Sequence, residues 1–563
     1  MKKITTLFLV FIVGLFTVST AQTALDPGQT VNTQIIGPGV YTVEAGKYYA
    51  FDGRIDLDFE ITIEGPDNGW VMDADSLPVL LNTPAMDGSA RDFFELKAGG
   101  SITFRNVLLS GTNSSGEVSG TFVANTGGSK MIADNCVFTD WTNFALRNQF
   151  KGDTISITNC VFINGVRLSN SPWGGFPLRM DVACSSVTIE NNSVVNSGRL
   201  TGNSGPWHNA NVHEMHNTYI NQTVNGHEQR ANEMITANNI YYNYHIRGRK
   251  NDNSMNPNNT YDSYFTTWNY FADSKDSLDK ISLYLGQNLF FREQEILDWY
   301  TGVPGDSMSA SLLWEHPDVD SFIVADTNYT IGTNYADVDP EFTMLPGKTD
   351  SILKWLNYHW NVNAPAEWPD WRVPPPVSFD GGGQPSLSWP PAIDLTYANV
   401  YMQTAGTDGL PLGDLNWFSD KKTEFLASRD AIVAAIRDSM VNAIAVYDPN
   451  TMDATPMITP WTTSIEAKLP EQIFALSNYP NPFDQTTSIQ FGLVDPSRIT
   501  LTVSNTYGQK VFEMTTENIL APGEHEYKFD ASKLSSGIYI YTITGTATNG
   551  RSYVASKRMI LSK

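Results

Sequence analysis

The tetrapeptide NCVF occupies residues 135–138 and returns unchanged at residues 159–162 of this 563-residue chain. Related stretches, each with an Asn shortly before apolar residues, are centred on Asn106, Asn191, Asn217, Asn238, Asn269 and Asn288. Neighbouring stretches lie 19 to 32 residues apart. A recurring unit of this length indicates a coil of chain that buries its apolar side only by stacking on the coils before and after it.

Apolar and polar residues alternate before these Asn positions. Residues 102–105 are ITFR, residues 155–158 are ISIT and residues 187–190 are VTIE. A period of two is typical of a β-strand. Because strands recur in successive units without helices between them, an all-β right-handed parallel β-helix is predicted for residues 22–372, with irregular insertions after about residue 250. Asn suits the corners because it tolerates a left-handed backbone and its amide can bond to the Asn of the next coil.

The chain has three cysteines, Cys136, Cys160 and Cys184. The first two occupy the same position in the repeated tetrapeptide, so they are expected to stack on adjacent coils, facing inward. Adjacent strands lie about 4.8 Å apart, which leaves both a disulfide and a pair of buried thiols open. There is no CxxC pair and no zinc-ligand spacing, so no metal site is predicted from these residues.

The first 21 residues carry Lys2 and Lys3, an apolar run and then small residues before Gln22, which is the pattern of a signal peptide. No later stretch is apolar enough to predict a transmembrane segment. The net charge of −24 excludes a general affinity for nucleic acid or anionic lipid. Residues 373–470 are predicted to hold a Pro- and Gly-rich linker and a helix over about 421–446 that Asp420 caps.

The C-terminal part, residues 471–563, consists of short alternating strands separated by turns, which predicts an immunoglobulin-like β-sandwich. Four motifs in this part resemble the C-terminal sorting domain of the type IX secretion system: LSNYPNPFDQTTSIQF (476–491), SNTYGQKV (504–511), SSGIYIY (535–541) and SKRMILSK (556–563). The resemblance implies passage across the outer membrane by the type IX machinery, followed by release or attachment to the cell surface. An adhesive immunoglobulin-like module is the alternative.

One region departs from the acidic character of the chain. Residues 147–250 hold nine Lys and Arg against six Asp and Glu, together with five of the eight histidines. Such an island indicates an anionic ligand, although chance clustering over this length is the alternative.

Two arginines of this island are predicted to share one face of the β-helix. Arg147 and Arg179 each lie twelve residues before a corner Asn, and the alternation of their strands turns both outward. The same alternation turns Ala145 and Gln149 outward on the first strand and Asp181 on the second. Two like charges one strand apart require an anion between them, which is a bound uronate, a sulfate or a structural Asp.

Later coils extend this face with groups suited to proton transfer and to stacking of a sugar ring. The catalytic candidates are Arg147, Arg179, His208 and His227, and the substrate-binding candidates are Gln149, Asp181, Trp207, Glu228 and Arg230. A second outward column is expected just before the corners, at Asp134, Glu190, Glu214 and His216. Polar ladders that merely solvate a β-helix are the alternative for any of these residues.

The coil pattern of the main body is similar to the pectate-lyase-like superfamily, which includes polysaccharide lyases, hydrolases and non-enzymatic adhesins. That resemblance implies an acidic polysaccharide as partner, and for a lyase it implies a base together with a cation, often Ca²⁺, at the uronate carboxylate. The sequence lacks an Asp cluster with calcium-ligand spacing and lacks the paired carboxylates of a pectin hydrolase on the predicted face. Two hypotheses therefore remain, a lyase that acts by β-elimination and a non-catalytic glycan-binding surface protein.

Overall fold

The computed structural model describes residues 22–168, 174–198, 201–203, 209–223, 227–228, 231–244, 246, 282–301, 329–331, 334–336, 338–360, 365, 367–440, 473–493, 496–505, 509–516, 518–547 and 552–563. The predicted signal peptide lies outside these residues. The chain divides into two compact units, residues 1–463 and residues 464–563, and each is described by itself. The finer domain boundaries given above stay predictions.

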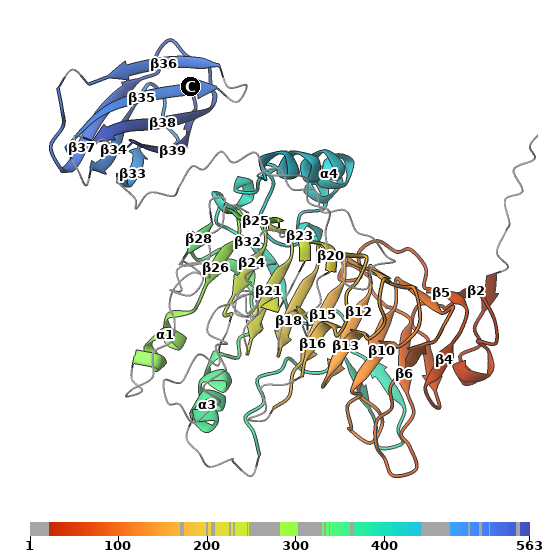
Figure 1. The fold of residues 1–563 in the computed structure, drawn as a ribbon. Coiled ribbons are helices and arrows are strands. Elements are labelled where there is room, and N and C mark those ends of the chain that lie inside the picture. Colours follow the sequence, from red (N-terminus) through yellow and green to blue (C-terminus); the bar gives the residue numbers. More distant parts are fainter. Residues whose placement is uncertain are drawn as a thin grey trace, which may run out of the picture. The chain divides into compact units, whose positions relative to one another are not determined.

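The first unit is built from three parallel sheets whose strands follow one another in turn along the chain (Figure 1). Sheet A contains β1(Gln22–Ala24), β2(Gly39–Thr42), β5(Glu60–Glu64), β8(Ser101–Arg105), β11(Lys130–Asp134), β14(Thr154–Thr158), β17(Ser186–Glu190), β20(Asn209–Met215), β23(Ala231–Ala237), β25(Ser282–Gly286) and β27(Tyr329–Ile331). Sheet B contains β3(Tyr48–Phe51), β6(Val79–Asn82), β9(Leu108–Ser110), β12(Val137–Trp141), β15(Val161–Gly165), β18(Ser193–Ser197), β21(Thr218–Gln222), β24(Ile240–Tyr242), β26(Leu289–Phe291) and β28(Tyr335–Ala336). Sheet C contains β4(Ile55–Leu57), β7(Phe94–Leu96), β10(Thr121–Asn125), β13(Phe144–Asn148), β16(Phe176–Met180), β19(Thr201–Asn203) and β22(His227–Glu228). This arrangement confirms the predicted parallel β-helix.

The corners between sheets A and B hold residues with a left-handed backbone, as predicted for Asn. Asn106, Asn135, Asn159, Asn191 and Asn238 all have φ between 53° and 63°. In two coils the prediction was wrong by one residue. The left-handed residues there are His216 and Gln287, and the Asn that follows each of them points into the coil instead. The stretch around Asn269 lies outside the described residues.

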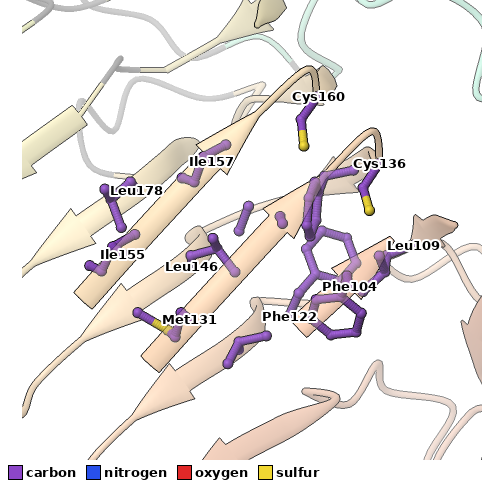
Figure 2. Packing of buried hydrophobic residues seen from close by; sticks show 14 of the residues in the cluster. Phe104, Leu109, Phe122, Met131, Cys136, Leu146, Ile155, Ile157, Cys160 and Leu178 are labelled. Carbon is purple, nitrogen blue, oxygen red and sulfur yellow. The ribbon is translucent and has the colours of Figure 1, made fainter. Parts of the chain in front are cut away.

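The position after the corner forms a buried column inside the β-helix. Cys136 and Cys160 occupy it in successive coils, and both are free, buried thiols, which decides between the two alternatives (Figure 2). The column continues as a ladder of side-chain amides, in which each Asn bonds to the next along the axis: Asn192, Asn217, Asn239, Asn288 and Asn334. The Cys160 backbone N–H joins the ladder by donating to Asn192 Oδ1 at 2.8 Å.

The interior of the coils is filled by apolar side chains from all three sheets. Phe104 and Phe122, labelled in Figure 2, each pack edge to face against Phe138. Phe138 stacks on Phe162 in the next coil with ring centroids 4.9 Å apart. The identical tetrapeptides thus place identical rings and thiols in register. Aromatic stacking between coils adds about 0.5–1.5 kcal/mol per pair to the burial of the rings.

The rest of the first unit packs against sheets A and B. Residues 371–412 cover the outer face of sheet B with apolar side chains such as Val377, Leu395 and Leu412. Helix α4(Ser419–Ser439) packs Phe425, Val433 and Ile436 against sheet A. Smaller elements complete this part: α1(Gln294–Thr301), β29(Phe342–Met344), α3(Thr349–Trp360), β30(Val377–Phe379), β31(Pro385–Leu387), β32(Asp394–Tyr397) and the 3-10 helices η1(Val31–Thr33), η4(Met402–Thr404) and η5(Leu415–Trp417).

Helix α4 corresponds to the helix predicted over about 421–446, of which residues 441–446 lie outside the described residues. The prediction that Asp420 caps this helix was wrong. Phe418 occupies the N-cap position, and Asp420 lies in the first turn, where its negative charge favours the helix dipole.

The second unit is a sandwich of two antiparallel sheets, as predicted. One sheet has the order β33(Ile473–Tyr479), β34(Thr486–Leu493), β37(Gly523–Asp530), and the other has the order β36(Lys510–Thr515), β35(Ser497–Asn505), β38(Gly537–Ala547), β39(Ser552–Leu561). Its core contains Phe491, Leu501, Phe529 and Tyr541. Across both units, the described helices include none with the length and apolar character needed to span a membrane.

Candidate functional site

The outer face of sheet C brings the two predicted arginines together. Arg147 on β13 pairs in register with Arg179 on β16, so they lie on adjacent coils, as the spacing predicted. The same register row continues along the sheet in both directions. In order it contains Asp56, Glu95, Ala124, Arg147, Arg179, Gly202 and Glu228.

Asp181 supplies the negative charge between the two arginines. Its Oδ2 accepts from Arg147 Nε at 2.7 Å and contacts an Arg147 terminal nitrogen at 2.7 Å, and its Oδ1 accepts from Arg179 Nε at 3.0 Å. The sequence analysis left three anions open between the arginines: a uronate, a sulfate or a structural Asp. The structure contains the structural Asp. The group of two guanidinium ions and one carboxylate keeps a net charge of +1.

Both guanidinium groups also lie over aromatic rings of their own strands. Arg147 Cζ is 5.0 Å from the ring centroid of Phe144, and Arg179 Cζ is 5.1 Å from that of Phe176. A cation over an aromatic face gains about 0.5–2 kcal/mol. Together with Asp181, these rings fix the orientation of both arginine side chains.

The two arginines differ in exposure. The side chain of Arg147 is 35% exposed and that of Arg179 is 13% exposed. Gly202, the next residue of the row, leaves room for Arg179, because a Cβ at this position would lie 2.7 Å from the Phe176 ring and 3.4 Å from Arg179 Nη1. Arg147 is therefore the accessible member of the pair, and Arg179 is the supporting one.

The row continues toward the N-terminus with a second group of charges. Glu95 is paired with Arg54 and Lys97, and Asp56 also bonds to Arg54. The side chains of Arg54 and Lys97 are 44% and 39% exposed, whereas that of Glu95 is 12% exposed. The side chain of Asp56 is 49% exposed, so this group presents both cations and a carboxylate to solvent.

The structure describes some of the other predicted site residues and not others. Gln149 is exposed just after β13, and its backbone N–H donates to Asn125 O at 2.7 Å. His227 and Glu228 form β22 at the end of sheet C, where the backbone of Glu228 pairs with Gly202 in the row of the arginines and that of His227 pairs with Thr201. Trp207, His208 and Arg230 lie outside the described residues.

Some sequence predictions around this face were wrong. Ala145, expected to face outward beside Arg147, is fully buried in the main apolar cluster. Glu214, expected in a second outward column, lies inside the coil, where its carboxylate accepts from the Tyr219 hydroxyl at 2.6 Å. The one-residue shift at the His216 corner explains this error, because it reverses the direction of each side chain on the strand before it.

The remaining residues of that column serve structural contacts. Glu190 is buried and forms a two-point ion pair with Arg429 of α4, with the Nε to Oε2 distance at 2.7 Å. His216 is buried and contacts Asp408 Oδ2 at 2.8 Å. Asp134 accepts from the Thr158 hydroxyl and the Asn159 amide of the next coil.

The sequence analysis missed several buried carboxyl groups. Asp153, inside the β-helix, has its pKa raised to about 7 by burial, against the opposing effect of hydrogen bonds from Asn125 and Cys184. Asp414, between sheet B and α4, has its pKa raised to about 6 by burial. Neither residue belongs to a repeated motif, so periodicity gave no signal for them. Among the described residues, no group of three or more His, Cys, Asp or Glu side chains could hold a metal ion.

Comparison with known proteins identifies the C-terminal module. Residues 477–560 match the family model described as the secretion system C-terminal sorting domain. This part of the chain is therefore a type IX sorting domain, as predicted, and it indicates export by the type IX secretion system to the medium or the cell surface.

The comparisons say less about the main body. No curated protein matches the chain. Among solved structures, the PL6 family alginate lyase AlyGC is similar over 56% of this chain and 40% of its own, with 11% sequence identity and a TM-score of 0.27. The matched region thus spans less than half the length of that enzyme.

Proposed function

We propose that this exported protein binds acidic polysaccharide along the outer face of sheet C. The observation that carries the proposal is the register of Arg147 with Arg179, bridged by Asp181. Arg147 contacts Asp181 through Nε and one terminal nitrogen. Among the described residues, none bonds to its other terminal nitrogen. A planar guanidinium held in this way presents N–H donors suited to the carboxylate of a uronate.

The charge of the face supports an acidic ligand. Along the row, the four cations Arg54, Lys97, Arg147 and Arg179 balance the four carboxylates Asp56, Glu95, Asp181 and Glu228, so the face is close to neutral on a chain whose net charge is −24. The group of Arg147, Arg179 and Asp181 within it keeps a charge of +1. Sheets A and B carry α4 and residues 371–412 on their outer faces. Sheet C instead keeps three of its cations partly exposed, which suits an extended anionic chain that crosses several coils.

Replacing Arg147 with Ala is expected to weaken binding to a polyuronate by about 5- to 20-fold, because one charge-assisted contact is lost. Arg147→Lys keeps the charge but loses the planar fork, so an intermediate loss is expected. Affinity electrophoresis or calorimetry at two salt concentrations measures both effects. Arg105→Ala is the matched control, because Arg105 is an exposed arginine on sheet A that pairs with Glu64. Equal affinity in the Arg147→Ala and Arg105→Ala variants would contradict the proposal.

β-Elimination on the same polysaccharide is the second candidate, favoured by the backbone position of Glu228. The backbone of Glu228 follows Arg179 and Gly202 in one register row, and Glu is a residue type that can act as a general base. Incubation with polyuronates, with and without Ca²⁺, is expected to give unsaturated chain ends that absorb in the ultraviolet. Glu228→Gln should abolish that product and retain binding. Binding without any product in the wild type rules out this second candidate and leaves the first intact.

A further inference from the structure

A buried Asp, Asn and Lys meet where η5 runs into α4. Asp414 and Asn416 are almost fully buried, and Lys422 is half-buried one turn into the helix. Asp414 is fixed against sheet B, where its Oδ2 accepts from the Ser193 hydroxyl at 2.7 Å and its backbone N–H donates to the Thr218 hydroxyl at 2.9 Å. The cluster is separate from the face of sheet C.

The hydrogen bonds of Asn416 orient its amide toward the lysine. Its Nδ2 donates to Asp414 Oδ1 and to the Asn191 backbone carbonyl, both at 2.7 Å. Its Oδ1 accepts from Lys422 Nζ at 2.5 Å. Because a carbonyl bond is about 1.23 Å long, Lys422 Nζ lies within roughly 3.7 Å of the amide carbon Cγ of Asn416. That separation is close to the contact distance of a reactive pair.

Burial shifts the pKa values of Lys422 and Asp414 in opposite directions, both towards the neutral forms. Burial lowers the pKa of Lys422, although Asp414, Asp134, Cys160 and Asp67 act in the opposite direction. Burial raises the pKa of Asp414 to about 6, against the hydrogen bonds from Asn416 and Ser193. A proton shared between these two groups is therefore held less firmly by the lysine, and more firmly by the carboxyl, than it would be in water.

We propose that Lys422 and Asn416 join in an intramolecular isopeptide bond, with Asp414 as the proton carrier. The neutral amine attacks, so that a bond forms from Nζ to Cγ of Asn416 and the bond from Cγ to Nδ2 breaks. Asp414 gives its proton to the departing Nδ2 and takes up the proton that Nζ loses. Ammonia leaves, the product is a secondary amide, and Asp414 ends as it began, so the step needs no further reactant.

The position of the bond gives it a structural purpose. Asn416 is anchored to the Asn191 corner of the β-helix, and Lys422 lies in the first turns of α4, whose later part is held by Arg429 on Glu190 and Arg437 on Glu233. A covalent link would fasten the start of α4 to the coil that it covers. Burial of the amide also keeps out the water that would compete with the amine.

Mass spectrometry of peptides from the purified full-length protein tests the proposal. The wild type is expected to yield a branched peptide in which residues 416 and 422 are joined and the mass is lower by one ammonia. Recovery of the two peptides only in unlinked form, with intact Asn416 and Lys422, would overturn it. The linked peptide rather than the total mass must be assigned, because cyclisation of an N-terminal Gln22 after signal cleavage also releases ammonia.

Three variants separate the chemistry from the fold. Asp414→Asn keeps the hydrogen-bond acceptor but not the proton carrier, so the rate of linkage should fall about 100-fold. Asn416→Asp should still give the same linked peptide, now by loss of water. Lys421→Met is the matched control, because Lys421 is partly exposed and pairs with Glu424, and it should leave the link unchanged. A link that survives Asp414→Asn at the wild-type rate would contradict the role of Asp414.

Discussion

Replacement of Asn217 with Ala is expected to lower the free energy of unfolding of the β-helix by about 3–5 kcal/mol. The Asn217 side chain is fully buried in the amide ladder. Its Oδ1 accepts from the backbone and side-chain nitrogens of Asn192 at 3.0 and 2.9 Å, and its Nδ2 donates to the carbonyl of Ile189 at 2.9 Å and to Asn239 Oδ1 at 3.0 Å. Alanine removes these four hydrogen bonds and orphans the Asn192 backbone N–H, which costs about 1–3 kcal/mol, and each other lost bond contributes about 0.5–1.5 kcal/mol. Asn192 Nδ2 keeps its bond to Ile157 O, and Asn239 Oδ1 keeps that from the backbone N–H of residue 217.

Urea unfolding followed by circular dichroism measures this loss as a shift in the transition midpoint. Asn68→Ala is the control, because Asn68 is an exposed residue of a loop and its replacement should change stability by less than about 0.5 kcal/mol. Indistinguishable midpoints for the two variants would show that the ladder does not stabilise the coil.

Asn217 also marks the limit of what the sequence predicts about the fold. The alternation before each corner and the Asn at the corner are local patterns, so they were enough to predict a parallel β-helix. Which of two adjacent residues turns the corner depends on side chains in the neighbouring coils. At residues 216 and 217, Asn217 joins the amide ladder and His216 adopts the left-handed backbone of the corner. At residues 191 and 192, two adjacent Asn residues occupy the corner and the ladder. An Asn before an apolar run therefore does not by itself show which residue forms the corner.

In the candidate site, too, the sequence predicted what local patterns determine and missed what depends on contacts between distant residues. The pairing of Arg147 with Arg179 could be predicted, because both lie at the same distance from a corner and coils stack in register. The alternation also placed Asp181 beside them. It did not predict that Asp181 bonds to both arginines, because that depends on side-chain rotamers. Contacts made by the segment after the β-helix could not be predicted from the sequence. For example, Glu190 and Arg429 lie 239 residues apart, and neither belongs to a recognisable motif.

The carboxyl of Asp153 is expected to make the β-helix less stable as the pH rises from about 4 to 7. Its side chain is fully buried, Oδ2 accepts from Asn125 Nδ2 at 2.7 Å, and Oδ1 has no partner among the described residues. Burial raises the pKa of this carboxyl from 3.8 to about 7. Between these two values the folded chain keeps the proton while the unfolded chain has lost it, so unfolding releases a proton and becomes more favourable with increasing pH. Below this window both states are protonated, and above it both are ionised, so the effect levels off.

The Asp153→Asn variant removes this dependence, because an amide occupies the same volume and does not ionise. The stability lost by the wild type between pH 4 and pH 8 should exceed that lost by the variant by on the order of 2–4 kcal/mol. The comparison with the variant is needed because Asp140 and Asp414, whose pKa values burial raises to about 6, contribute in the same direction in both proteins. Asp58→Asn, a change at an exposed position, should retain the full wild-type dependence. If Asp153→Asn retained it as well, the Asp153 carboxyl would have to be ionised inside the fold, and the hydrogen bonds from Asn125 and Cys184 would be enough to hold a buried charge.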